Sequence, residues 1–110
     1  LGPLAAPAVP DLIKALNCGD PFVESSAPRA LGAIGPAAAP AVPALIAKLK
    51  DEKDGTAWFS ADALGEIGEP ALVAIPALEI AAQSKWELMA DSANAALEKL
   101  RKLQDDPNKK

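Results

Sequence analysis

The stretch RALGAIGP at residues 29–36 returns 33 residues later as DALGEIGE at residues 62–69. Leu1-Gly2-Pro3 stands 33 residues upstream of Ile34-Gly35-Pro36, at the same place in an earlier copy. A unit of this length cannot bury its own apolar face and must stack on copies of itself. The period therefore predicts a short solenoid of stacked repeats.

Apolar residues mark two amphipathic helices in each copy. The stripe of the first helix has i, i+3, i+4, i+7 spacing and consists of Val9, Leu12, Ile13 and Leu16, then Val42, Leu45, Ile46 and Leu49, then Ile75, Leu78, Glu79 and Ala82. The stripe of the second helix has i, i+4, i+7, i+8, i+11 spacing and consists of Val23, Ala27, Ala30, Leu31 and Ile34, then Thr56, Ser60, Ala63, Leu64 and Ile67, then Met89, Ala93, Ala96, Leu97 and Leu100. The sequence thus predicts an all-α fold, an α-solenoid of about three helical hairpins.

Glycines and prolines indicate where these helices begin and end. Left-handed caps are expected at four glycines that follow the second stripes, namely Gly32, Gly35, Gly65 and Gly68. A proline deep inside a helix costs about 3 kcal/mol, so three recurring prolines are expected in a first helical turn or at a fixed bend: Pro10, Pro43 and Pro76.

Two local boundaries follow from single residues. Asp20 before Pro21 predicts an N-cap and the first residue of the second helix of repeat one. Pro28 falls within the stripe of that helix, so either the helix kinks near Glu24 or it begins only around Ser25 or Ser26. In the middle repeat we expect a turn at residues 36–39 and a first helix at roughly 40–50.

The expected domain organisation is a single repeat domain over residues 1–103, followed by a polar tail at 104–110. Its repeats cover approximately residues 3–35, 36–68 and 69–103. The chain looks cut at its N-terminus, because Leu1-Gly2 resembles the end of a preceding repeat.

The two segments at 29–36 and 62–68, with Ala41-Val42-Pro43-Ala44-Leu45 between them, resemble the short HEAT-like repeats first recognised in phycobilisome lyases. Ankyrin repeats share the period but carry a Thr-Pro-Leu-His box, and this chain has no histidine; tetratricopeptide repeats need aromatic landmarks that are absent here. The resemblance implies an armadillo-type superhelix whose first helices form the convex layer and whose second helices line the concave one. By analogy alone it also suggests the alternative of a bilin-lyase-like enzyme.

One departure from the family pattern concerns the arginine that often begins the second helix. Its place is taken by Glu24, Ala57 and Ala90. We therefore expect apolar packing, more than buried ion pairs, to hold neighbouring repeats together.

The two ends of the chain are expected to differ. In the last repeat Glu79 replaces an apolar stripe residue and Glu98 replaces the glycine of Gly32 and Gly65, as a polar terminal cap requires. No such cap precedes the first repeat. The chain is therefore expected to be the C-terminal piece of a longer array, or to associate with itself through the uncapped N-terminal repeat.

Composition excludes most chemistry. Without His or Tyr and with only Cys18, the chain cannot assemble the usual acid–base or metal-ligand sets, so no catalytic residue, metal or cofactor is expected. The lone cysteine also excludes an internal disulfide, which fits a reducing compartment; a soluble, cytoplasmic protein is the default expectation. No apolar run approaches the roughly 20 residues that span a bilayer, so no membrane association is expected.

A binding function is expected on the face of the second helices. Trp58 is predicted to point away from the buried stripe, with Asp62 one turn on and Ala61 beside it. Trp58 is either an exposed interface anchor or a cover over apolar surface. Phe59 is expected to be structural and to face the next repeat, and Trp86 to pack at the start of the last helix.

The charge of this face predicts its partner. The net charge is −4, and residues 51–98 are markedly acidic. Binding to DNA or RNA would need aligned Lys and Arg to replace phosphate counterions, so nucleic acid is not expected. A basic or apolar protein segment fits better, and the candidate partner-binding residues are Glu24, Arg29, Trp58, Asp62, Glu66 and Asp91.

Overall fold

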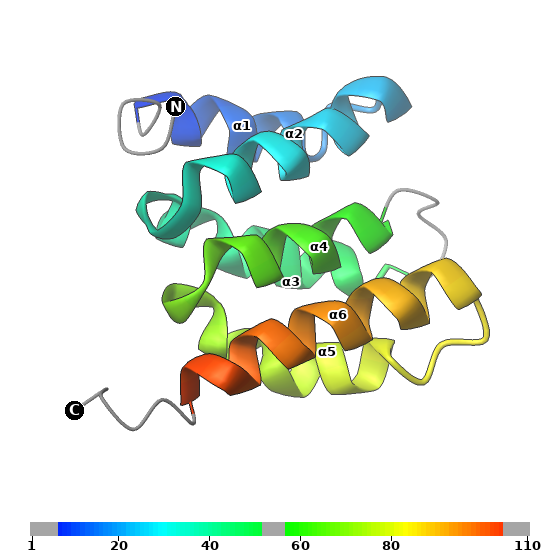
Figure 1. The fold of residues 1–110 in the computed structure, drawn as a ribbon. Coiled ribbons are helices and arrows are strands. Elements are labelled where there is room, and N and C mark those ends of the chain that lie inside the picture. Colours follow the sequence, from blue (N-terminus) through cyan, green and yellow to red (C-terminus); the bar gives the residue numbers. More distant parts are fainter. Residues whose placement is uncertain (1–6, 52–56, 105–110) are drawn as a thin grey trace.

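The described residues of the computed structural model, 7–51 and 57–104, form three helical hairpins in chain order (Figure 1). The hairpins pair α1 (Val9–Ala15) with α2 (Pro21–Ile34), α3 (Val42–Leu49) with α4 (Ala57–Ile67), and α5 (Ile75–Ala81) with α6 (Glu87–Gln104). Two 3-10 helices join them, η2 (Gly35–Ala41) and η3 (Glu69–Ala74). The predictions for Leu1-Gly2, Thr56 and residues 105–110 concern positions outside the described residues.

The hairpins stack side by side, so that the helices form two layers. In Figure 1, α2, α4 and α6 make the front layer, and α1, α3 and α5 lie behind them. α4 packs between α2 and α6. The principal extents of 42 × 37 × 18 Å describe a slab only two helices thick. The predicted α-solenoid is thereby confirmed.

The first turns of the helices follow the predicted chemistry. Asp20 accepts a hydrogen bond from the backbone N–H of Phe22 through Oδ1 at 2.9 Å, and Pro21 is the first residue of α2, as an N-cap sequence requires. α2 then runs through Pro28 to Ile34, so of the two alternatives for this helix, a start around Ser25 or Ser26 is wrong. The three recurring prolines each lie in the first turn of α1, α3 and α5, which confirms their predicted place.

The connection between the first two hairpins differs from its prediction. The turn expected at 36–39 is the 3-10 helix η2, and α3 begins at Val42 instead of residue 40. Gly35 and Gly68 end their helices with φ of 79° and 86°, backbone conformations that favour glycine. The left-handed caps expected at Gly32 and Gly65 are wrong, because these glycines are buried within α2 and α4.

Gly32 and Gly65 instead allow neighbouring helices to approach closely. A Cβ at Gly32 would lie 3.1 Å from the Glu66 Cβ and 3.3 Å from the Ala63 Cα on α4. A Cβ at Gly65 would lie 3.0 Å from the Ala96 Cα on α6. The two seams of the stack thus use the same contact, a glycine against the residues that follow it by about 33 positions.

Both predicted stripes line a continuous core. Leu31, Leu45, Leu64, Leu78 and Leu100 are fully buried. Stripe residues at the edges, such as Leu12 and Ile13, are partly buried and pack against this core. Burial of this apolar surface stabilises the stack by about 25 cal/mol per Å² removed from water.

One seam also contains an ion pair, which the sequence did not predict. Glu24 on α2 lies with its Oε1 3.5 Å from the Nζ of Lys48 on α3, and both side chains are largely buried. Its Oε2 accepts a hydrogen bond from the Gly19 N–H at 2.7 Å. An ion pair therefore adds to the apolar packing between repeats one and two. Glu24 stands at the position where repeats of this family often carry arginine, and its side chain reaches Lys48.

The segment Pro21–Leu49 contradicts the expectation that no apolar run approaches the length of a membrane span. By length and composition alone, this segment could cross a membrane. In the structure, Gly35 and η2 divide this segment into α2 and α3. Core helices of folded domains meet the same criterion, and 44% of the window is buried.

Candidate binding surfaces

A groove lies between α2 and α4 on the layer of second helices. It has a volume of about 300 Å³ and is bordered by Arg29, Gly32 and Ala33 on α2 and by Phe59, Asp62 and Glu66 on α4. Gly32 brings the two helices together here. We call this feature the α2–α4 groove.

The two walls of the α2–α4 groove carry opposite charge. Arg29 is exposed on α2, and no ion pair involves it among the described residues. Asp62 on α4 is half-buried. Glu66 is exposed and forms a hydrogen-bonded ion pair with Lys99 of α6. The groove therefore offers a guanidinium donor on one wall and carboxylate acceptors on the other.

Three of the predicted partner-binding residues meet in this groove, and three lie elsewhere. Arg29, Asp62 and Glu66 border it. Glu24 is held by Lys48 and Gly19 at the beginning of α2. Asp91 is exposed on α6. Glu24 and Glu66 both have cationic partners, so this face is less acidic than its residue list suggests.

Trp58 is half-buried and packs against the core, as the second of its two readings proposed. Its ring stacks on Phe59 with centroids 3.9 Å apart. Ala61, expected beside it on the exposed side, is fully buried. The physical reason is that α4 has a helix on each side within its layer, so more of its circumference is covered than a single stripe implies.

Phe59 also lies on the side opposite to its prediction. It borders the groove with α2 and so faces the preceding repeat, whereas it was expected to face the next one. A one-residue step around a helix is about 100°, which is too coarse to assign a flanking side chain to one of two neighbours.

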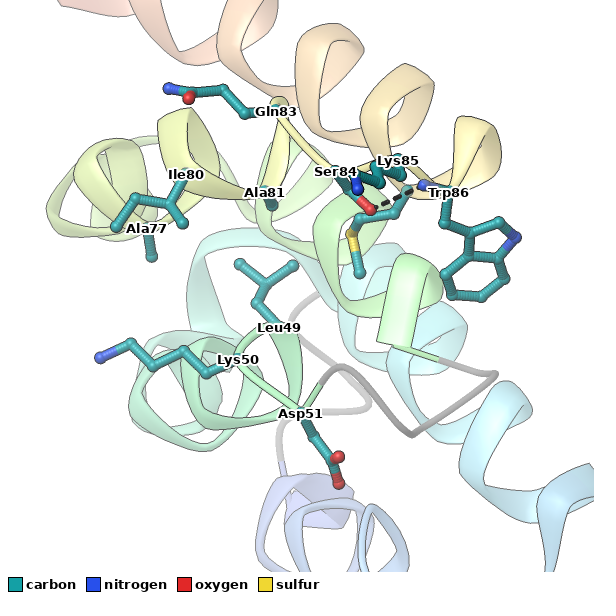
Figure 2. A pocket seen from close by; sticks show the side chains of 11 residues that line it. Leu49, Lys50, Asp51, Ala77, Ile80, Ala81, Gln83, Ser84, Lys85 and Trp86 are labelled. Atoms are coloured by element: carbon teal, nitrogen blue, oxygen red, sulfur yellow. Dashed lines mark hydrogen bonds between the residues drawn. The ribbon is translucent and has the colours of Figure 1, made fainter.

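A second cavity was not predicted from the sequence. It has a volume of about 650 Å³, and its apolar lining comes from the end of α3, from α5 and from the start of α6: Leu49, Ala77, Ile80, Ala81, Trp86 and Met89. Lys50, Asp51 and Lys85 also border it. Figure 2 shows these side chains, with Trp86 at one end and its backbone N–H donating to Ser84 Oγ at 3.0 Å. We call this feature the α3–α5–α6 pocket.

Trp86 is therefore more exposed than predicted, since it precedes α6 and borders this pocket. The cavity could not be read from one stripe because three separate segments build it. One signal was present: Ile80 stands where the other repeats have Lys14 and Ala47, an unusual apolar residue at an exposed position.

The described residues show no arrangement suited to metal binding, and no cluster of three metal-ligating side chains occurs among them. Cys18 is exposed in the turn between α1 and α2, where its Sγ accepts from the Asp20 N–H at 3.5 Å. That contact supports the turn.

The chain has the architecture of a helical-hairpin solenoid with a groove on its second-helix layer. A family model described as HEAT repeats matches residues 9–98, and the chain belongs to this family. HEAT repeats generally mediate protein–protein interaction and are typically not enzymes. No curated protein and no solved structure gave a significant match.

Proposed function

We propose that this chain is a non-catalytic protein-interaction module that binds a segment of a partner protein in the α2–α4 groove. The observation that carries the proposal is the meeting of Arg29, Phe59 and Asp62 at one concave feature between two repeats. Surface grooves with an aromatic wall and a few polar groups suit a peptide, because apolar contact supplies affinity and the polar groups fix orientation.

The groove favours a segment that is basic or apolar. Asp62 and Glu66 would accept hydrogen bonds from a Lys or Arg of the partner, and Phe59 would contact its apolar side chains. Arg29 would donate to a backbone carbonyl of the bound segment. Trp58 stacks on Phe59, so Trp58→Ala should weaken binding by altering the aromatic wall of the α2–α4 groove.

We further propose that this chain is the C-terminal part of a longer array. Leu12 and Ala30 are only partly buried, whereas their counterparts Leu45 and Ala63 are buried. A preceding repeat would cover these positions. On α6, Glu98 stands where a following repeat would need the glycine contact of Gly32 and Gly65. Among the described residues, no observation favours the bilin-lyase alternative.

A selection from a random peptide library displayed on phage tests the binding proposal. We expect selected peptides to be enriched in Lys, Arg and aromatic or aliphatic residues, and Asp62→Asn to weaken their binding about tenfold, since a charge-assisted hydrogen bond is lost.

The matched control is Asp91→Asn, which removes the same charge from an exposed site on α6 outside the groove. Unchanged affinity for both variants would refute the groove as the site. Selection of acidic peptides instead would refute the proposed chemistry of the partner.

A further inference from the structure

The α3–α5–α6 pocket and the exposed Phe22 are complementary. We propose that the pocket receives the Phe22 side chain of a second copy of this chain, and that the reciprocal contact closes a symmetric dimer. This surface is separate from the α2–α4 groove, so the proposal stands independently of the proposed function.

The pocket has the properties of a receptor for a large apolar side chain. Its apolar residues border a volume of about 650 Å³. Two of them remain in contact with solvent, with Ile80 exposed by 73% and Trp86 by 36%. In Figure 2 Ile80 lies on one side, the Trp86 ring on the other, and Leu49 between them.

Phe22 has the properties of the matching ligand. It is the most exposed large hydrophobic residue of the described chain, at 77%. It lies in the first turn of α2, where its N–H is fixed by Asp20. The helix thus holds the backbone of Phe22 in place, which lowers the entropy lost on binding.

Charge favours the same pairing. Lys50 and Lys85 border the pocket, and among the described residues neither takes part in an ion pair. Phe22 is preceded by the exposed Asp20, whereas Glu24 is held by Lys48 and the Gly19 N–H within its own chain. Asp51 also borders the pocket, but its carboxylate points away from the apolar residues in Figure 2. The Asp20 carboxylate beside the aromatic ring would therefore lie close to the lysines at the rim of the apolar pocket.

The two features lie on one edge of the molecule. α2 begins, and the α5–α6 connection lies, on the right-hand side of Figure 1, where the first helices end. Facing these edges toward each other lets each copy offer Phe22 to the pocket of the other, as a two-fold interface requires. Because each contact consists of one aromatic side chain in one pocket, we expect weak, concentration-dependent association.

Sedimentation velocity over a concentration series tests the proposal. We expect the wild-type chain to shift from monomer to dimer as concentration rises, and Phe22→Ser to raise the dissociation constant at least about tenfold. Ile80→Ser should do the same from the pocket side. Val73→Ser is the matched control, because Val73 is 71% exposed on η3 and does not border the pocket.

Mixing Phe22→Ser with Ile80→Ser separates this contact from a general loss of folding. The first variant keeps its pocket and the second keeps its Phe22, so the mixture retains one intact contact and should associate more than either variant alone. A second readout uses Trp58→Phe, which leaves Trp86 as the sole tryptophan: its emission should shift to the blue on dimerisation.

Three results would overturn the proposal. The wild-type chain could remain monomeric at millimolar concentration. Val73→Ser could weaken association as much as Phe22→Ser does. The mixture could associate no more than its components, as would occur if Phe22 docked on a different surface.

Discussion

The two ends of the stack present different surfaces. On the first hairpin two outward residues, Leu12 and Ala30, are apolar and half-buried. On the last hairpin they are charged and joined to one another: Arg101 to Glu79 at 2.7 Å and Lys102 to Glu98 at 3.4 Å. A charged face is stable in water without a neighbour, whereas a small apolar face gains by being covered. A few side chains therefore determine whether a repeat of this kind can end the stack or gains stability by contacting a further repeat.

The largest expected effect compares one core position at the middle and at the first end. Leu45 is fully buried, and Leu12 is its half-buried counterpart in repeat one. Leu45→Ala should lower the free energy of unfolding by about 2–5 kcal/mol, and Leu12→Ala by about 1–2 kcal/mol. Urea denaturation measures both. Equal losses would show that the first end is as closed as the middle.

The second effect compares an ion pair at the first seam with one in the last repeat. Glu24→Ala removes the partner of Lys48 and of the Gly19 N–H, in a largely buried place, and should cost roughly 1.5–3 kcal/mol. Arg101→Ala breaks a half-exposed pair and should cost less than about 1 kcal/mol. Thermal unfolding at low and moderate salt measures both. A larger loss of stability for Arg101→Ala than for Glu24→Ala would contradict the expectation that the buried Glu24–Lys48 pair stabilises the fold more.

The third effect compares Gly65, which contacts α6, with Glu98, the residue at the same repeat position in α6. Gly65→Val would force side-chain atoms against the Ala96 backbone and should destabilise by about 1–3 kcal/mol. Glu98→Val, at the same register of α6, faces no following helix and should change stability by no more than about 0.5 kcal/mol. Chemical denaturation of the two variants, with Glu98→Ala as a control for helix propensity, gives the difference.

The smallest expected change in stability concerns the middle repeat, which lies between the two ends. Ser60 is fully buried, and its Oγ has no hydrogen-bond partner within the described part of the chain. Its counterparts in the other repeats are Ala27 and Ala93. Ser60→Ala should raise the free energy of unfolding by about 1 kcal/mol, because a desolvated hydroxyl is removed. A loss of stability would mean that the hydroxyl has a partner in solution.

The fold followed from the sequence because the period and the stripes repeat. Leu31, Leu64 and Leu97 are one position in three copies, and all are buried as predicted. Gly32 and Gly65 were misassigned because a cap and a close contact both require the absence of a Cβ. Only the position of the neighbouring helix distinguishes them.

The candidate site was predicted in part. Arg29, Asp62 and Glu66 were selected by register and border one groove. The pairing of Glu24 with Lys48 depends on how α2 lies against α3, which a stripe does not specify. The α3–α5–α6 pocket joins Leu49 to Trp86, residues far apart in sequence, so it required the packed structure.

The shared glycine contact at both seams has a consequence for building longer proteins of this kind. Because Gly32 meets α4 as Gly65 meets α6, a duplicate of residues 36–68 placed after residue 68 would find the same fit on both of its sides. The one mismatch would be electrostatic, since Glu66 would then face its own copy instead of Lys99. Changing the glutamate of the first copy to lysine would pair it with the second glutamate, which keeps Lys99 as its neighbour on the other side, and would give a rod that is one repeat longer.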